Sequence, residues 1–231
     1  MTRFLTLATV FAATVGGTDY AMGQNYDLQI PSSWSSGVTN TYFPLAPGTK
    51  YEFAAQTDEG QETNTVEVLA DTKVVHGVTA TVVWDRVFLN GSLVEATFDW
   101  YAQDGDGNVW YVGEDSKEYK NGQVVSSEGS WEWGVKGALP GVIMWANPAA
   151  RLGDAYRQEF LRGHAEDWGK VVALNQSVTV PYGSFAGCIK TEDWSGLETA
   201  REHKFYCPQV GTVLEVEPDG GRVELTVYTK P

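Results

Sequence analysis

The chain has 231 residues, of which 30 are acidic and 16 are basic, so its formal net charge is −14. A balance this acidic argues against nucleic acids and anionic membranes as partners, because both attract basic patches. After the first residues no window has about 18 apolar residues in succession, so no membrane span is expected.

The N-terminal segment has the pattern of a secretory signal peptide. A basic Arg3 precedes an apolar run from Phe4 to about Gly16, and Ala21 and Gly23 then provide the small residues of a cleavage site. We therefore expect a signal peptide over residues 1–23, a single β domain over residues 24–231, and a secreted or periplasmic location. The oligomeric state is left open.

In the first half of the chain, apolar and polar residues alternate with a period of two. Strands are predicted at Val66–Leu69, Thr79–Trp84 and Ser92–Trp100. The pairs Asn90-Gly91 and Asn121-Gly122 lie between such runs, and Asn-Gly favours a two-residue hairpin turn. This half is therefore predicted to be a meander of antiparallel hairpins.

An acidic stretch, Asp104-Gly-Asp106-Gly-Asn108, separates two aromatic runs. These side chains have the spacing of the first ligands of a calcium loop. The sixth position of such a loop should be Gly, however, and here it is Val109. Asp, Gly and Asn are also the residues that tight turns prefer. A hairpin turn is the favoured interpretation, with a weak calcium site at Asp104, Asp106 and Asn108 as the alternative; no other cofactor is expected.

The second half continues the alternation after a segment rich in Gly, Ala and Pro. That segment, Gly134–Asp154, shows no strand period and is predicted to be a long loop over the core. Because open sheet edges promote aggregation, so many strands should close on themselves. The predicted fold class is all-β, an antiparallel meander that forms a barrel or half-barrel. Its later strands are expected at Asp154–Leu161, Trp168–Leu174, Gln176–Val180, Cys188–Thr191, Arg201–Cys207, Gly211–Val216 and Arg222–Tyr228.

The two cysteines, Cys188 and Cys207, both fall in predicted strands. In an oxidising compartment they are expected to form a disulfide, which would stabilise the fold by about 3 kcal/mol in the chain-entropy model. A catalytic thiol and a metal–thiolate pair are less favoured alternatives, because no CxxC spacing accompanies the cysteines.

Three segments resemble a group of secreted or lipoprotein-type bacterial β-rich domains of unassigned function. They are Tyr42–Phe53, with its Phe-Pro-Leu opening, Val180–Cys188, with Val-Pro-x-Gly-x-Phe, and Glu202–Val216, with Tyr-x-x-x-Val-Gly. The resemblance implies a curved antiparallel sheet or half-barrel similar to envelope carrier proteins. Tyr182 replaces an Ala of the signature and Gln209 a Gly. If that Gly has a positive φ, Gln209 would strain the turn after the second cysteine.

Two sets of polar residues are predicted to share inner faces of their strands. Asp99 and Tyr101 alternate on one strand, and Glu202, Lys204 and Tyr206 alternate on another. If both faces point into the barrel, the sets would converge and provide paired acids for general acid and base chemistry. A structural ion pair between Glu202 and Lys204 is the simpler alternative.

The favoured function is that of a barrel-like extracytoplasmic protein that binds a small or apolar ligand, or a partner, in an aromatic-lined concavity. The alternatives are a secreted hydrolytic or metal-assisted enzyme, and a structural protein whose interior is filled by its own side chains. The ligand-binding candidates are Tyr101, Tyr111, Glu202, Lys204 and Tyr206; the catalytic candidates of the enzyme alternative are Asp99, Tyr101, Glu202 and Lys204, with His203 on the opposite face as a possible addition.

Overall fold

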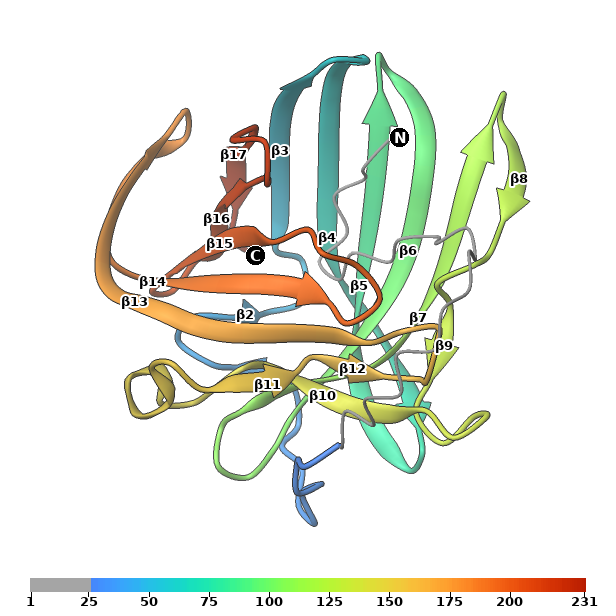
Figure 1. Cartoon of the computed structure of the whole chain (residues 1–231), viewed down its shortest axis with the longest axis vertical. Helices are drawn as coiled ribbons and strands as arrows, with labels where there is room; N and C mark the ends of the chain where they lie inside the picture. The colour runs from blue at the N-terminus through green and yellow to red at the C-terminus, as the bar shows by residue number, and fades with distance from the viewer. Residues whose placement is uncertain (1–25) are drawn as a thin grey trace.

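The computed structural model describes residues 26–231, and the signal peptide expected over residues 1–23 lies outside them. The described residues form an all-β fold, as predicted, dominated by one sheet of 15 strands. Thirteen of these strands follow one antiparallel order that is nearly closed into a barrel with one unsealed seam (Figure 1). No helix within this part of the chain has the length and apolar character needed to cross a membrane.

The long strands of the first half stand side by side in Figure 1, and those of the second half run across them. The order around the barrel is β11 (Ala155–Arg157), β13 (Asp167–Val180), β14 (Gly183–Ser195), β15 (Glu202–Cys207), β16 (Gly211–Val216), β17 (Arg222–Thr229), β3 (Lys50–Thr57), β4 (Gly60–Val75), β5 (Val78–Leu89), β6 (Ser92–Gln103), β7 (Val109–Lys120), β10 (Leu139–Met144) and β12 (Glu159–Phe160). The smaller elements are β1 (Val38–Thr39), paired with β2 (Pro44–Leu45); β8 (Gln123–Ser126) and β9 (Trp131–Glu132), both paired with β7; and a 3-10 helix, η1 (Pro148–Arg151).

The turn chemistry of the sequence is confirmed. Asn90 and Asn121 have φ values of 50° and 52°, and each is followed by a glycine of positive φ, as a type I′ turn requires. Gln209 has a φ of 65°, a left-handed conformation that favours glycine over a residue with a side chain. Its backbone N–H donates a hydrogen bond to the Thr41 carbonyl at 2.7 Å.

The segment predicted as a long loop, Gly134–Asp154, is only partly a loop. It contains β10, which pairs with β7 and β12 and is buried along most of its length. Burial on both faces removes the alternation by which a strand is recognised in sequence. Gly141 is needed here, because a Cβ on it would clash with the backbone of Gln158.

The unsealed seam lies where the chain passes from one end of the strand order to the other. Strands β11 and β12 are consecutive in the chain and separated only by Gln158, yet β11 pairs with β13 and β12 pairs with β10. Gln158 donates its backbone N–H to the Asp167 carbonyl at 2.8 Å. The predicted single strand Asp154–Leu161 is thus two short strands that approach the seam from opposite sides.

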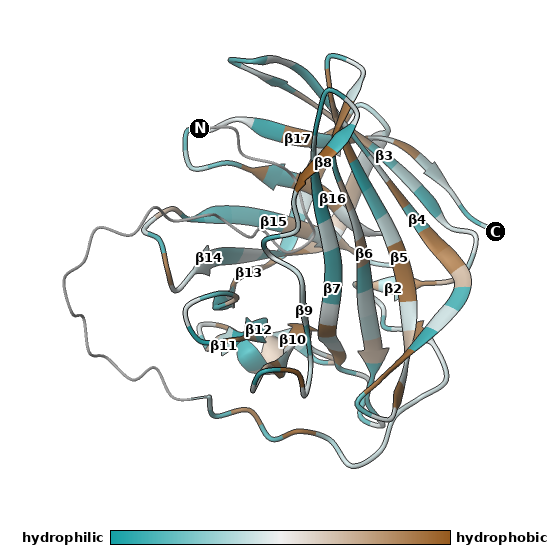
Figure 2. Ribbon diagram, turned by 90° about the vertical axis from the view of Figure 1, so that its right-hand side faces the viewer, coloured by the Kyte–Doolittle hydropathy of each residue, from teal (hydrophilic) through white to brown (hydrophobic). Residues whose placement is uncertain are grey.

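A β-bulge changes which side chains of β7 point into the barrel. Tyr101 pairs with Tyr111 while Trp100 pairs with Gly113, so Val112 is an extra residue on β7. Such an insertion reverses the alternation of faces beyond it. Consequently the side chains of Tyr111 and Glu114 both lie in the interior, although residues three positions apart on a regular strand would lie on opposite faces. Figure 2 shows both hydrophobic and hydrophilic residues along β4 and β5, which lie on the far side of β6 from β7.

The predicted disulfide between Cys188 and Cys207 is present, and both residues are fully buried. It joins β14 to β15, which are adjacent antiparallel strands. The cross-link therefore fixes the strands that carry Asp193, Glu202 and Lys204, whose side chains form the polar cluster described below.

Candidate functional site

The interior of the barrel is strongly acidic. Among the described residues, eleven buried carboxylates are accompanied by two buried cations, Arg157 and Lys204. Buried charges ordinarily need a partner of opposite sign, so most of these acids must be neutralised in another way. The eleven are Glu62, Asp85, Glu95, Asp99, Asp104, Glu114, Glu159, Asp167, Asp193, Glu202 and Glu215.

The first group of buried acids, which we call the inner acid cluster, comes from β5, β6, β7 and β12. Asp99 and Glu114 are direct cross-strand partners, an arrangement that is unfavourable when both are charged. Burial raises the pKa of Asp99 to about 7, although a hydrogen bond from Tyr111 lowers it. Burial, followed by the charge of Asp99, raises the pKa of Glu114 well above its ordinary value. The members of the cluster are Asp85, Glu95, Asp99, Glu114 and Glu159.

Two tyrosines on the same inner face have different roles. Tyr101 and Tyr111 are fully buried and stacked, with ring centroids 4.9 Å apart. The Tyr111 hydroxyl donates to Asp99 Oδ1 at 2.7 Å. With the Tyr111 hydroxyl proton donated to Asp99, neither carboxylate oxygen of the neighbouring Glu114 has a hydrogen-bond partner. The Tyr101 hydroxyl also has no partner. Tyr101 and Tyr111, both expected to bind ligand, thus lie deep inside the barrel.

The second group, the Lys204 cluster, consists of Asp193, Glu202, Lys204 and Glu215. The ammonium nitrogen of Lys204 lies 2.9 Å from Glu202 Oε1 and 3.9 Å from both Glu215 Oε2 and Asp193 Oδ2. Burial alone would lower the pKa of Lys204, but these carboxylates raise it well above its ordinary value. Lys204 is therefore a permanent cation that stabilises the charged form of the acids around it.

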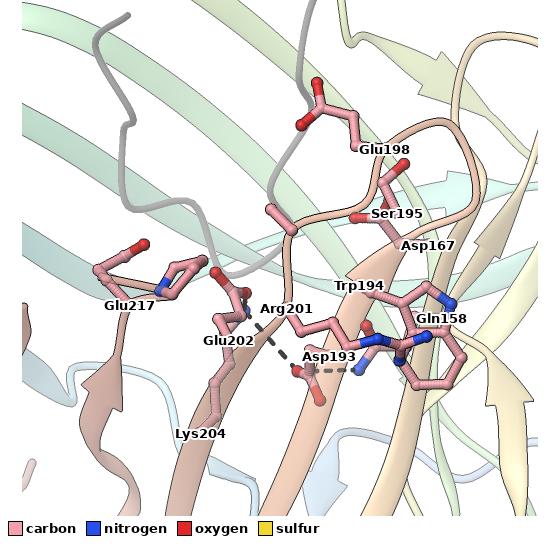
Figure 3. Close-up of a pocket in the computed structure, with 12 residues that line it drawn as sticks. Gln158, Asp167, Asp193, Trp194, Ser195, Glu198, Arg201, Glu202, Lys204 and Glu217 are labelled. Atoms are coloured by element: carbon pink, nitrogen blue, oxygen red, sulfur yellow. Dashed lines mark hydrogen bonds and ion pairs between the residues drawn. The ribbon is translucent and has the colours of Figure 1, made fainter. Parts of the chain in front are cut away.

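A small pocket opens beside the Lys204 cluster (Figure 3). Asp193, Glu202 and Lys204 lie on its inner side, and Glu217 lies at its rim. Its enclosed volume is about 20 Å³. Because roughly 10–15 Å³ of such space holds one water molecule, the pocket fits a water or a single ion and not an organic molecule.

The four catalytic candidates lie on two strands, with Asp99 and Tyr101 on β6 and Glu202 and Lys204 on β15. Asp99 and Tyr101 belong with the inner acid cluster, whereas Glu202 and Lys204 belong with the Lys204 cluster. The Phe43 ring contacts both groups, with its centroid 5.2 Å from that of Tyr101 and 6.2 Å from that of Tyr206. On β15 the expected alternation is present, because Glu202, Lys204 and Tyr206 are buried while the residues between them are half-buried. Their proposed chemical roles stay predictions.

The acidic stretch between β6 and β7 is a hydrogen-bonded turn. Asp104 Oδ1 accepts the backbone N–H groups of Asp106 and Asn108, and Asp104 Oδ2 accepts the Asn108 side-chain amide and the Trp110 indole N–H, all at 2.8–2.9 Å. Asn108 Oδ1 accepts the backbone N–H of Ala146. These contacts occupy the side-chain oxygens of Asp104 and Asn108, and they support the turn interpretation.

A larger groove, which we call the Trp145 groove, lies beside this turn. Its volume is about 810 Å³. Trp110, Trp145 and Tyr156 provide aromatic walls, and the rings of Trp145 and Tyr156 meet edge to face at 5.3 Å. Both the Trp145 Nε1 atom and the Tyr156 hydroxyl are buried without a hydrogen-bond partner. The remaining lining includes residues 27–33, Asp104–Asp106, Asn108, Arg151 and residues 153–155.

Sequence reasoning missed most of these functional residues. Asp193, Glu215 and Glu114 lie in strands whose register is set by bulges, and Tyr156 and Trp145 lie near the short strands of the seam. Alternation within a strand could not have placed Asp193 and Glu215, because they join the cluster as the cross-strand partners of Glu202 and Lys204. Comparisons of the chain with protein-family models, curated proteins and solved structures found no match.

Proposed function

We propose that this protein binds a small planar molecule, neutral or cationic, in the Trp145 groove, and that it does so outside the cytoplasm. The observation that carries this proposal is a groove of about 810 Å³ that is walled by the aromatic side chains of Trp110, Trp145 and Tyr156. Small-molecule sites ordinarily have volumes of about 300–1,000 Å³ and combine aromatic walls with a few polar groups.

The lining defines the chemistry of the ligand. The indole N–H of Trp145 can only donate a hydrogen bond, whereas the Tyr156 hydroxyl can donate or accept. Because Trp145 Nε1 is buried, a ligand with an acceptor would reach it, and remove the cost of leaving this donor unpaired, only after the ring turns toward the groove. Asp27, Asp106 and Asp154 line the groove against a single cation, Arg151. The local charge therefore disfavours anions.

The enzyme alternative receives less support. Asp99, Tyr101, Glu202 and Lys204 are buried and do not line the Trp145 groove. Burial explains the raised pKa of Asp99 without a catalytic role. The extracytoplasmic location is supported by the buried disulfide, because such bonds are rare in reducing compartments.

Fragment binding tests this proposal. Small aromatic compounds with a hydrogen-bond acceptor would be screened against the protein by ligand-observed NMR, and hits would be titrated by calorimetry. Trp145→Phe keeps an aromatic ring but removes the donor, so affinity should fall about threefold to tenfold, the value of one hydrogen bond. Trp84→Phe is the matched control, because Trp84 stacks on Phe98 outside the groove. An absence of hits, or equal affinity in both variants, would count against the proposal.

A further inference from the structure

A second large groove lies between the turn that joins β3 to β4 and the turn that joins β16 to β17. Residues 55–59 and Glu62 line it on one side, residues 217–223 line it on the other, and its volume is about 820 Å³. We call it the Glu62 groove. None of the described residues lines both this groove and the Trp145 groove, so the two are separate places on the molecule.

Glu62 is the first inward-facing residue of β4. From this residue onward burial alternates along the strand, with Asn64 and Val66 as the next buried positions, as expected where one face of a strand packs on the core. The direct partners of Glu62 on the neighbouring strands are Ala55 and Leu89. Both are apolar, so neither side chain offers the carboxylate a hydrogen bond.

The Glu62 carboxylate is buried without a partner. The residue is 4% exposed, and no hydrogen bond or ion pair of its side chain is found among residues 26–231. Burial, followed by the charges of Glu217 and Glu59, raises the pKa of Glu62 to about 7, and Glu95 on β6 is a further acid that faces it. A buried acid that lines a groove and has no cation beside it is a group that a positively charged ligand would satisfy.

The acids of the two turns lie around Glu62. Asp58 and Glu59 line the groove from the β3–β4 turn, and Glu217 and Asp219 line it from the β16–β17 turn. Acidic charge concentrated in a concave surface raises the local concentration of cations. The Glu62 groove should therefore attract positively charged molecules before any contact forms.

The cation that the groove contains is already engaged. Arg222 is the one Lys or Arg among the described residues that line it. Its Nε and Nη2 atoms donate hydrogen bonds to Glu224 Oε1, at 2.9 Å and 2.7 Å. Because Glu224 does not line the groove, the charge of Arg222 is paired with an acid outside it, and the acids inside keep their excess of negative charge.

We propose that the Glu62 groove binds a linear polyamine, with one terminal ammonium group on Glu62 and the others between the acids of the two turns. Ala55, Pro218 and Val223 also line the groove, and their apolar surface suits the methylene chains between the amino groups. A metal ion would need several oxygens at one point, whereas the acids here are spread over two turns and a strand. Alkylamines resemble the lysine side chain, with a pKa of about 10.4, so their amino groups are charged near neutral pH.

Calorimetric titration of the full folded chain with spermidine, putrescine and butylamine tests the proposal. The titration would be run at pH 8, above the pKa of Glu62, and at physiological ionic strength, which screens attraction between distant charges. Affinity should decrease from spermidine to putrescine to butylamine, because the number of ammonium groups decreases. Glu62→Gln keeps the shape of the side chain and removes its charge. Spermidine binding should then weaken about tenfold to a hundredfold, the value of a hydrogen bond to a charged group.

Glu52→Gln is the matched control, because Glu52 is an exposed residue of the adjacent β3 that does not line the groove. This variant loses the same charge and should keep the affinity for spermidine. Trp145→Phe should keep it as well, so failure of this site and failure of the proposed ligand groove are distinguishable.

Three results would overturn the proposal. One is an absence of spermidine binding by the wild-type protein. Another is equal weakening by Glu62→Gln and Glu52→Gln, which would indicate a general attraction to an acidic chain. The third is tighter binding of a trilysine peptide than of spermidine, which would assign the groove to a basic peptide.

Discussion

The inner acid cluster and the Lys204 cluster line the same barrel interior but are neutralised differently. In the inner acid cluster, Asp99 faces Glu114 across two strands and burial raises the pKa of both. In the Lys204 cluster, Lys204 faces Glu215 and lies 2.9 Å from Glu202. The first cluster contains no cation, whereas in the second the charge of Lys204 lowers the pKa values of Asp193 and Glu215, which burial still raises above their ordinary range.

The two clusters differ because a lysine, Lys204, occupies one inward position of the second cluster, whereas the first cluster contains no cation. A buried carboxylate without a cation avoids its desolvation cost by taking up a proton, whereas a buried lysine keeps its neighbours ionised if the geometry is close. Two predictions of opposite kind follow. The stability contributed by the inner acid cluster should depend on pH, and that contributed by the Lys204 cluster should depend on retaining its cation.

The largest expected effect is a loss of stability as the pH rises. The pKa of Glu95 is raised to about 8 and that of Asp99 to about 7, chiefly by burial. Both acids therefore bind protons more tightly in the folded state than in the unfolded state, where they titrate near pH 4. Stability is fully present below that value and is lost as the pH rises through 7 to 8.

Denaturant unfolding at pH 5 and pH 8 measures this effect. The free energy of unfolding should be on the order of 5 kcal/mol lower at pH 8, because each pKa unit corresponds to about 1.4 kcal/mol. Asp99→Asn should make the dependence shallower, since the amide takes no proton. A stability that is constant, or that increases over this range, would show that the acids are not held in their protonated form.

The second effect concerns Lys204→Met. Removing the ammonium leaves Glu202, Glu215 and Asp193 buried without a cation, which should cost about 3–5 kcal/mol in the free energy of unfolding. The double variant Lys204→Met/Glu202→Gln should recover part of the loss. Lys50→Met is the control, because Lys50 also lies 2.9 Å from a glutamate, Glu67, but is exposed; it should cost no more than about 1 kcal/mol. Small, additive effects of the Lys204 and Glu202 changes would indicate a solvated pair.

Much of this architecture was predictable from local patterns. Alternation identified the long strands, Asn-Gly identified two hairpin turns, and alternate positions on β15 placed Glu202 and Lys204 on one face. These features depend on neighbours in sequence. The strand β10 was missed because Val142, Ile143 and Met144 are all buried, so no alternation marks it.

The composition of the clusters was less predictable, because it depends on pairing between distant strands. Asp85 and Asp99 lie on adjacent strands, but the bulge at Val112 is what adds Glu114 to them. Glu159 joins the inner acid cluster from β12, the last strand in the order, which pairs with β10. A one-residue difference in register would exchange inward and outward side chains, and the sequence contains no local signal for such a shift.

The smallest expected effect separates the two stacked tyrosines of the inner acid cluster. Tyr111→Phe removes the hydrogen bond to Asp99 and leaves a buried carboxyl group with one partner fewer. This should cost about 1–3 kcal/mol in the free energy of unfolding. It should also raise the pKa of Asp99 further, since that bond is the contact that lowers it.

Tyr101→Phe is the matched change, because Tyr101 is equally buried and stacks on Tyr111, but its hydroxyl has no partner. Removing an unpaired buried hydroxyl should be neutral or slightly stabilising. Equal losses in the two variants would mean that the Tyr101 hydroxyl also makes a stabilising contact, and would contradict the special role of the bond between Tyr111 and Asp99. A larger loss for Tyr111→Phe, with the stability profile of that variant displaced toward higher pH, would assign the difference to the bond with Asp99.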